Sequence, residues 1–304
     1  MKPAYLLLLV AMNCLWAATL STFKVLSPWL DAGGIVTWRY ALASIACVLL
    51  WPWLPGAAPR GRDLLKSVWI GVLVFCLGPR MQTAGVQMGQ AGDAAMLMAF
   101  EPLLCAVAAA LVLRERIAPR RWLGFACGMS GVMLISKVWM ANFHWHQLAA
   151  NGLVLTSFLA ETAYSIVGKP VLERAGPFKV MAVALFTGTV LNLAWDGPRV
   201  ASQATAFTVQ VWGHLLYLSL VCTVFGYGLW LVVIRETPVN IVVLTVFVQP
   251  VAGLIIAMIW LHEKPHWGQL WGAIAIIAGL AAGLRRKDDE CESADGPPQR
   301  DNRE

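Results

Sequence analysis

Long apolar runs alternate with short connections along almost the whole chain, and the connections carry Pro, Gly and charged residues. Each run is long enough to cross the hydrocarbon core of a membrane as an α-helix, which takes about 20 residues. The pattern therefore predicts an all-α integral membrane protein with ten transmembrane helices, at residues 4–23, 33–54, 64–87, 92–113, 119–138, 148–168, 177–196, 211–234, 239–261 and 266–284.

The composition agrees with this pattern. Of the 304 residues, 59% are apolar and 13% are charged, whereas a soluble domain has about 45–50% apolar and about 25% charged residues. A water-soluble enzyme is excluded, and ten spans leave no room for a large soluble domain. The net charge of +6 is spread in small groups between the runs, so we interpret it as a topology signal and expect no nucleic-acid partner.

The basic residues also predict the orientation. With the N-terminus inside, 17 of the 23 Lys and Arg fall in connections on the inner side or in the tail. The outer side holds Lys24, Lys137, Arg199 and Lys264. Because cytoplasmic loops carry the excess of basic residues, we expect both termini in the cytoplasm of a bacterium and the chain in its inner membrane. The charged segment 286–304 is expected to be a disordered cytoplasmic tail.

An internal repeat appears when the sequence is shifted by 148 positions against itself. Seven positions of the first half then match identical residues of the second, without a gap: Gly78 and Gly226, Pro102 and Pro250, Ala109 and Ala257, Leu113 and Leu261, Glu115 and Glu263, Gly124 and Gly272, Gly131 and Gly279. The repeats span residues 4–138 and 148–285. Because five helices is an odd number, the second repeat must be inverted relative to the first, an architecture of secondary transporters.

Three stretches make the interpretation more specific: AMNCLWAATLSTFKVL, AFEPLLCAVAAALVLRERI with RRWLGFACGMSGVMLI, and VFVQPVAGLIIAMIWLHEKPHWGQLWGAIAIIAGL. They resemble the two repeats of the EamA family in the drug/metabolite transporter (DMT) superfamily, over residues 4–285. The resemblance implies a ten-helix, 5+5 inverted-repeat permease that exports amino acids, related metabolites or toxic organic compounds.

Glu101 is the first candidate for chemistry, because it lies near the middle of the fourth predicted span and a charge there is costly unless it serves a function. Its repeat mate is Gln249. Pro102 and Pro250 follow them, and a proline frees the carbonyl four residues earlier for a proton, a cation or a substrate amine. The structural alternative is that the prolines only kink the helices and that Glu101 is held protonated or paired with Arg.

Two arginines lie within predicted spans. We expect Arg80 to meet Glu101 across a central cavity or to bind a substrate carboxylate through a bidentate pair; a permanent ion pair or snorkelling is the alternative. Arg39 lies near the outer end of its span, and we expect it to snorkel to the surface.

Further candidates for the cavity wall lie at comparable depth in other spans. They are Glu161, Asn13, Trp16, Tyr164, Tyr227 and Trp230. Tyr and Trp rings bind organic cations and flat solutes, but most of the 15 Trp residues of such a chain are expected in belts at the membrane surfaces.

Three acidic residues are expected at span ends. Asp93 suits the positive end of a helix dipole, and Glu115 and Glu263 close two spans, where they pair helix ends during gating or are simply solvated. The segment His262-Glu263-Lys264-Pro265-His266 matches the H-E-x-x-H zinc pattern. Pro265 breaks the helical turn that this pattern needs, so we expect no metal site.

These features predict a secondary transporter that moves a small metabolite, an amino acid or related zwitterion, by alternating access, with protons as the expected coupling ion and no cofactor. The alternatives are an exporter of lipophilic organic cations and, from another class, a non-transport membrane subunit or enzyme. The partners expected are the small-molecule substrate and the lipid bilayer, with the chain acting as a monomer or a homodimer.

Overall fold

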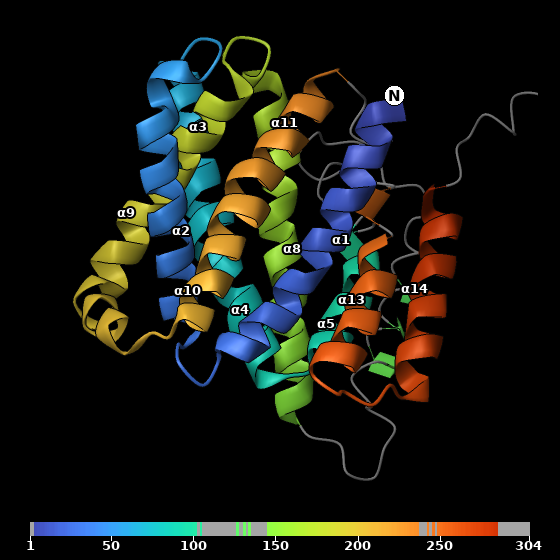
Figure 1. The fold of residues 1–304 in the computed structure, drawn as a ribbon. Helices are drawn as coiled ribbons and strands as arrows, with labels where there is room; N and C mark the ends of the chain where they lie inside the picture. Colours follow the sequence, from blue (N-terminus) through green and yellow to red (C-terminus); the bar gives the residue numbers. More distant parts are fainter. Residues whose placement is uncertain are drawn as a thin grey trace, which may run out of the picture.

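The computed structural model describes residues 3–101, 104, 126–127, 130–131, 133–134, 145–236, 242, 245–246 and 248–284. All regular secondary structure within these residues is helical (Figure 1). The α-helices are α1 (Pro3–Leu26), α2 (Ala32–Leu50), α3 (Arg62–Val72), α4 (Gly78–Met88), α5 (Ala91–Leu97), α8 (Trp145–Val171), α9 (Pro177–Gln203), α10 (Val209–Leu216), α11 (Gly226–Glu236), α13 (Val248–Trp260) and α14 (Trp267–Leu284).

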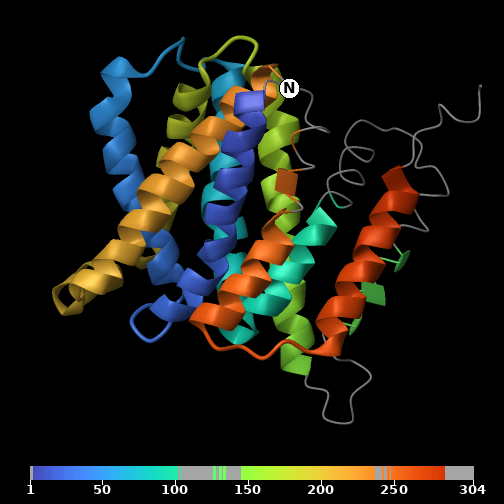
Figure 2. The same ribbon diagram turned by 45° about the vertical axis from the view of Figure 1, so that its right-hand side comes forward.

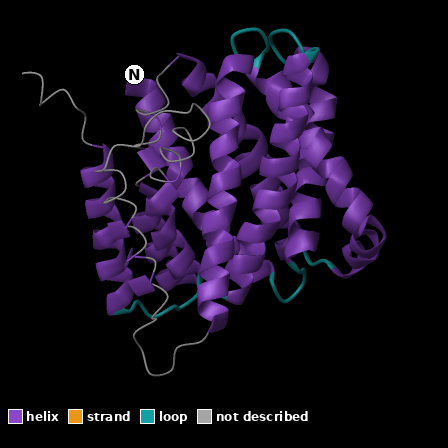
Figure 3. Ribbon diagram, turned by 180° about the vertical axis from the view of Figure 1, so that it is seen from behind, coloured by secondary structure: helices purple, strands orange, loops and turns teal. Residues whose placement is uncertain are grey.

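The described helices follow the apolar runs. Five helical stretches are long and apolar enough to span a membrane: Ala4–Leu26, Ala32–Trp53, Arg62–Met88, Pro177–Ala206 and Val209–Glu236. Helices α8 and α14 cover the sixth and tenth predicted spans. The fourth, fifth and ninth spans lie wholly or partly outside the described residues, so the count of ten helices stays a prediction. Figure 3 shows the loops gathered at the two ends of the bundle.

The two halves of the chain interleave rather than forming separate bodies. Helix α1 packs on α13, α4 packs on α8, and α2 and α3 both pack on α9. Figures 1 and 2, two views 45° apart, both show α1 beside α13. Two clusters of buried apolar side chains fill the bundle, one around Phe23 and Phe158 and the other around Tyr40 and Phe75. A space between the halves is therefore lined by helices from both repeats.

Two π-helical segments break the regular α-helical hydrogen bonding. They cover Leu73–Leu77, between α3 and α4, and Tyr217–Phe225, between α10 and α11. The 148-residue shift places 73–77 on 221–225, inside the second segment, and each segment ends at a glycine of the repeat. The repeat is therefore visible in local backbone structure as well as in sequence. π-Helical turns are rare and recur at functional sites.

Large apolar side chains also cover the outside of the bundle. Leu7 is 72% exposed, Leu49 is 67% exposed and Ile259 is 71% exposed. In water such a surface would be costly, but lipid tails cover it without loss. The outer surface therefore agrees with the spans in assigning the chain to a membrane.

Candidate functional site

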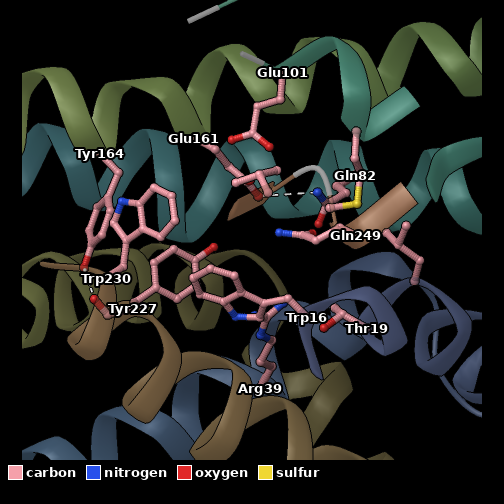
Figure 4. A pocket seen from close by; sticks show the side chains of 13 residues that line it. Trp16, Thr19, Arg39, Gln82, Glu101, Glu161, Tyr164, Tyr227, Trp230 and Gln249 are labelled. Carbon is pink, nitrogen blue, oxygen red and sulfur yellow. Dashed lines mark hydrogen bonds between the residues drawn. The ribbon is translucent and has the colours of Figure 1, made fainter. Parts of the chain in front are cut away.

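A cavity lies inside the bundle, between the two buried apolar clusters. The pocket is partly open, and the space in it and at its mouth that protein atoms leave empty is about 690 Å³. Its walls come from both halves of the chain: Trp16, Thr19, Leu20, Arg39, Gln82, Met98, Glu101, Glu161, Tyr164, Tyr227, Trp230, Val246 and Gln249 (Figure 4). Of the residues predicted from sequence, seven line this cavity together: Glu101, Glu161, Gln249, Trp16, Tyr164, Tyr227 and Trp230.

Two carboxylates occupy one side of the cavity. Glu101 follows a 3-10 turn at Met98–Phe100, and Glu161 lies in the middle of α8. Figure 4 shows both side chains reaching into the same space, so a negative charge on one disfavours a negative charge on the other. Gln82 donates a hydrogen bond from Nε2 to Glu161 Oε1 over 3.4 Å. One wall of the cavity is therefore acidic and accepts hydrogen bonds.

Arg39 faces this acidic wall from the other side of the cavity (Figure 4). The prediction that it snorkels to the surface is wrong, because it is 3% exposed. Its Nε donates to Thr223 Oγ1 over 2.8 Å, and the guanidinium carbon lies 5.1 Å from the centre of the Tyr40 ring. Thr223 belongs to the second π-helical segment and donates its own proton to Leu218 O. Its hydroxyl oxygen is thereby free to accept the bond from Arg39.

Arg80 does not line the cavity. Its Nε donates to Asn192 Oδ1 over 2.7 Å, its Nη2 forms an ion pair with Asp196, and its guanidinium lies 4.8 Å from the centre of the Trp195 ring. All three partners are on α9. The expected contact of Arg80 with Glu101 is therefore not formed, and the pairing found is the permanent ion pair of the structural alternative.

A chain of buried amides holds Gln249 in place. Asn13 Nδ2 donates to Leu9 O over 2.8 Å and to Thr245 Oγ1 over 3.0 Å, and Asn13 Oδ1 accepts a hydrogen bond from Gln249 Nε2. Asn13 was expected in the cavity wall, but it lies behind Gln249. The 3-10 turn at Thr245 and Val246 precedes Pro250, which is buried in α13. Pro102 lies outside the described residues.

Aromatic rings form the remaining wall. The Trp16 ring centre lies 5.6 Å from that of Tyr227 and 5.8 Å from that of Trp230, and Tyr164 lies 5.2 Å from Tyr227. Trp16 Nε1 donates to Cys222 O over 2.8 Å. A Cβ atom on Gly226 would lie 2.8 Å from Trp16 Nε1, so the glycine of the repeat makes room for the indole. These rings, inclined to one another by 53–89°, offer an apolar wall to a solute.

A second polar cluster lies at the end of the bundle where α5 and α14 begin. Asp93 is fully buried; it accepts hydrogen bonds from Gln147 and, over 2.9 Å, from Gln269 Nε2, and lies 3.0 Å from His266 Nε2. Glu263 accepts from the backbone N–H groups of residues 91 and 92 over 3.0 and 2.8 Å. The carboxylate that meets the start of α5 is therefore that of Glu263, whereas Asp93 binds side chains.

Glu263 and His266 of the H-E-x-x-H segment both take part in this cluster. Among the described residues no group of three or more His, Cys, Asp or Glu side chains could hold a metal ion. Glu115, the repeat mate of Glu263, lies outside the described residues. The cavity, the cluster around Asp93 and the pairing of Arg80 with Asn192 and Asp196 are thus three places where the described residues gather buried polar groups.

Three polar residues of the cavity were missed or misjudged from sequence. Arg39 was assigned to the membrane surface, and Gln82 and Thr19 were not singled out. Gln82 gave one usable signal, a polar side chain within a predicted span. Nothing in the sequence of Thr19 distinguishes it from the other hydroxyl residues of its helix.

Comparison with known proteins places the whole chain among transporters. The sequence profile of the EamA-like transporter family matches residues 2–137 and again residues 148–283. A probable terminal-alkyne amino-acid exporter of Streptantibioticus cattleyicolor is 26% identical over 285 residues, covering 94% of this chain and 95% of that protein. A probable amino-acid metabolite efflux pump of Salmonella typhimurium is 25% identical over 302 residues, covering 92% and 93%. One solved crystal structure superposes with a TM-score of 0.62 at 14% identity, over 93% of this chain and 97% of the other, which shows likeness of fold.

Proposed function

Because the chain belongs to the EamA-like transporter family, we propose that it is a secondary transporter that exports a small zwitterion, such as an amino acid, by alternating access. One observation carries the proposal: the guanidinium of Arg39 and the carboxylates of Glu101 and Glu161 face one another across a single cavity. A zwitterion fits such a cavity with its carboxylate at Arg39 and its ammonium at the acidic wall. The names of the two relatives, an amino-acid exporter and an amino-acid metabolite efflux pump, support the same substrate class.

The proposed architecture is a ten-helix 5+5 inverted repeat in the inner membrane, with repeats at 4–138 and 148–285 and both termini cytoplasmic. The two matches of the family profile support two repeats, and so do the π-helical segments that the 148-residue shift brings together. In alternating access the repeats rock around a site at their interface, and the cavity lies at such an interface. The proposed binding site lies within one copy of the chain, with a monomer or a homodimer as the functional unit.

Charge balance supports coupling to protons. Two ionised carboxylates and one guanidinium leave the cavity with one net negative charge, and a zwitterion does not change this. One proton on Glu101 or Glu161 makes the cavity with its bound substrate neutral. Neutrality lowers the free-energy cost of closing the occupied site within the low-dielectric membrane. The proton gradient then supplies the driving force, and the proposed mechanism needs no cofactor.

A second candidate substrate class is lipophilic organic cations, favoured by the four aromatic rings beside the acidic wall. In this case the carboxylates bind the cationic head and Arg39 only balances charge. A non-transport membrane subunit is less favoured, because buried charges facing an open cavity would then destabilise the fold without serving a function.

Transport by the full chain in proteoliposomes tests these proposals. A panel of labelled amino acids and organic cations is supplied with and without an imposed pH gradient, to wild type and to Glu101→Gln. Gradient-driven movement of amino acids that is lost in the variant supports the proposal. Movement of organic cations instead identifies the second substrate class, and gradient-independent movement in both proteins refutes proton coupling through Glu101.

A further inference from the structure

Gln249 carries a buried acceptor atom that the described protein leaves without a partner. The side chain is 3% exposed and lines the cavity. Its Nε2 donates to Asn13, whereas no hydrogen bond reaches its Oε1 in the described part of the chain. A buried amide oxygen without a hydrogen-bond donor is destabilising, so such an atom in a residue that lines a cavity points to a ligand that supplies the missing donor.

The direction of every hydrogen bond behind Gln249 follows from the chemistry of the groups. The carbonyls of Leu9 and Val242 can only accept, so Thr245 must donate to Val242 O and Asn13 Nδ2 must donate to Leu9 O and to Thr245. Asn13 therefore presents its oxygen to Gln249, which must answer with its N–H. The amide of Gln249 cannot be turned over without breaking this chain, so its oxygen is held as an acceptor.

The carboxylates of Glu101 and Glu161 are, like Gln249 Oε1, hydrogen-bond acceptors. Glu101 and Glu161 line the same cavity, and carboxylates accept hydrogen bonds when ionised. The protein offers Gln82 Nε2 to Glu161, at a long 3.4 Å. Gln249 Oε1 and the two carboxylates thus form a set of acceptors, here called the acceptor site, for which the described residues supply one long hydrogen bond, from Gln82.

We propose that the acceptor site binds a primary ammonium group of the substrate, and that Gln249 selects amines bearing N–H against fully alkylated ones. A primary ammonium carries three N–H donors and no acceptor, which matches two carboxylates and one amide oxygen. A quaternary ammonium keeps the charge but has no N–H, so it leaves Gln249 Oε1 buried and unpaired. A site built to hydrogen-bond an N–H group rejects an analogue that lacks it for this reason.

Asn13 and Thr245 act in this scheme as positioning residues. They do not line the cavity, but they determine which end of the Gln249 amide faces the substrate. The selectivity therefore depends on a series of hydrogen bonds that joins α1 to the turn before α13. This inference rests on the proposed transport function and narrows its substrate class.

Competition in the same proteoliposomes tests the inference. Phenylalanine and N,N,N-trimethylphenylalanine are added as unlabelled competitors of the panel solute that wild type transports. Phenylalanine is expected to inhibit at a concentration about tenfold lower than its trimethyl derivative, the ratio for one lost hydrogen bond of about 1.4 kcal/mol. In Gln249→Leu, which keeps the volume and removes the amide, the ratio is expected to fall to about twofold or less.

Two further variants separate selectivity from folding. In Gln249→Glu, the protonated carboxyl group can donate to Asn13 and still present a carbonyl oxygen, so the preference for phenylalanine is expected to return. Gln269→Leu removes another buried Gln amide, at 2% exposure and away from the cavity, and should keep the wild-type ratio even if it lowers stability.

The outcomes distinguish the two levels of the hypothesis. Equal action of the two competitors on wild type, or an unchanged ratio in Gln249→Leu, overturns the role of Gln249 and leaves the transport proposal intact. Failure of wild type to move any amino acid or organic cation of the panel overturns the transport proposal, and this inference with it.

Discussion

Replacing Arg39 by Gln tests whether the cavity reads a substrate carboxylate. The change removes the guanidinium that faces Glu101 and Glu161, while an amide at the same position can still hydrogen-bond Thr223. A substrate without a carboxylate should not depend on this guanidinium. Phenylalanine and phenylethylamine form the matched pair, because they differ in the carboxylate alone.

The expected magnitude follows from the type of contact. A guanidinium and a carboxylate form charge-assisted hydrogen bonds, and hydrogen bonds to charged groups contribute about 1.5–3 kcal/mol net. Their loss should weaken competition by phenylalanine about 10- to 150-fold. Competition by phenylethylamine should stay the same or strengthen, since Arg39→Gln removes a positive charge facing its ammonium.

The assay is the concentration of each competitor that halves uptake of the labelled solute. Arg80→Gln is the control, because Arg80 is paired with Asp196 on α9 and does not line the cavity. This control should lower thermal stability without changing the ratio of the two competitors. Equal weakening of both competitors in Arg39→Gln would refute the assignment of the carboxylate to Arg39.

Three other predictions concern packing, the cluster at the start of α5 and coupling. Gly226→Ala should destabilise the protein by about 1–3 kcal/mol and alter its Trp fluorescence, because the new Cβ meets the Trp16 ring at 2.8 Å. Gly213→Ala, with nothing within 4 Å of the new atom, should be neutral or stabilising, and equal effects of the two changes would contradict the packing argument. Asp93→Ala should lower stability by roughly 3 kcal/mol, seen as a lower unfolding temperature in detergent, because the buried side chain of Gln269 and the half-buried side chains of Gln147 and His266 lose their acceptor; an unchanged unfolding temperature would contradict this. Glu161→Gln should make initial uptake rates independent of an imposed pH gradient, because the loaded cavity is then neutral without a proton, and a retained gradient dependence would argue against the charge balance.

The positions of the helices were predictable because they depend on local composition. Apolar runs must satisfy their backbone hydrogen bonds internally in a membrane, and a helix is the form that does so within one segment. The repeat was visible from residues whose effect is also local, such as Gly226 and Pro250. The residues of the fourth and fifth spans mostly lie outside the described structure, so the ten-helix arrangement stays a prediction.

The cavity was predictable in part. Glu101, Glu161 and Gln249 stood out because polar groups deep in a span are costly, and all three line it. The roles of the two arginines were not predictable, since both lie in spans and the sequence does not say which neighbour each one meets. Asp196 lies at the end of an apolar run, and nothing local marks it as the partner of Arg80.

The sequence alone determined that this chain is a helical membrane protein with an internal repeat and acidic groups at membrane depth. Those properties depend on composition and spacing, which act within one helix. The tertiary structure decided that Arg39 rather than Arg80 faces the carboxylates, and that Asn13 lies behind Gln249 and orients its amide. These outcomes depend on the rotation of each helix about its axis and on the partners that packing supplies. In particular, the π-helical turn that presents Thr223 to Arg39 belongs to another helix in the other half of the chain.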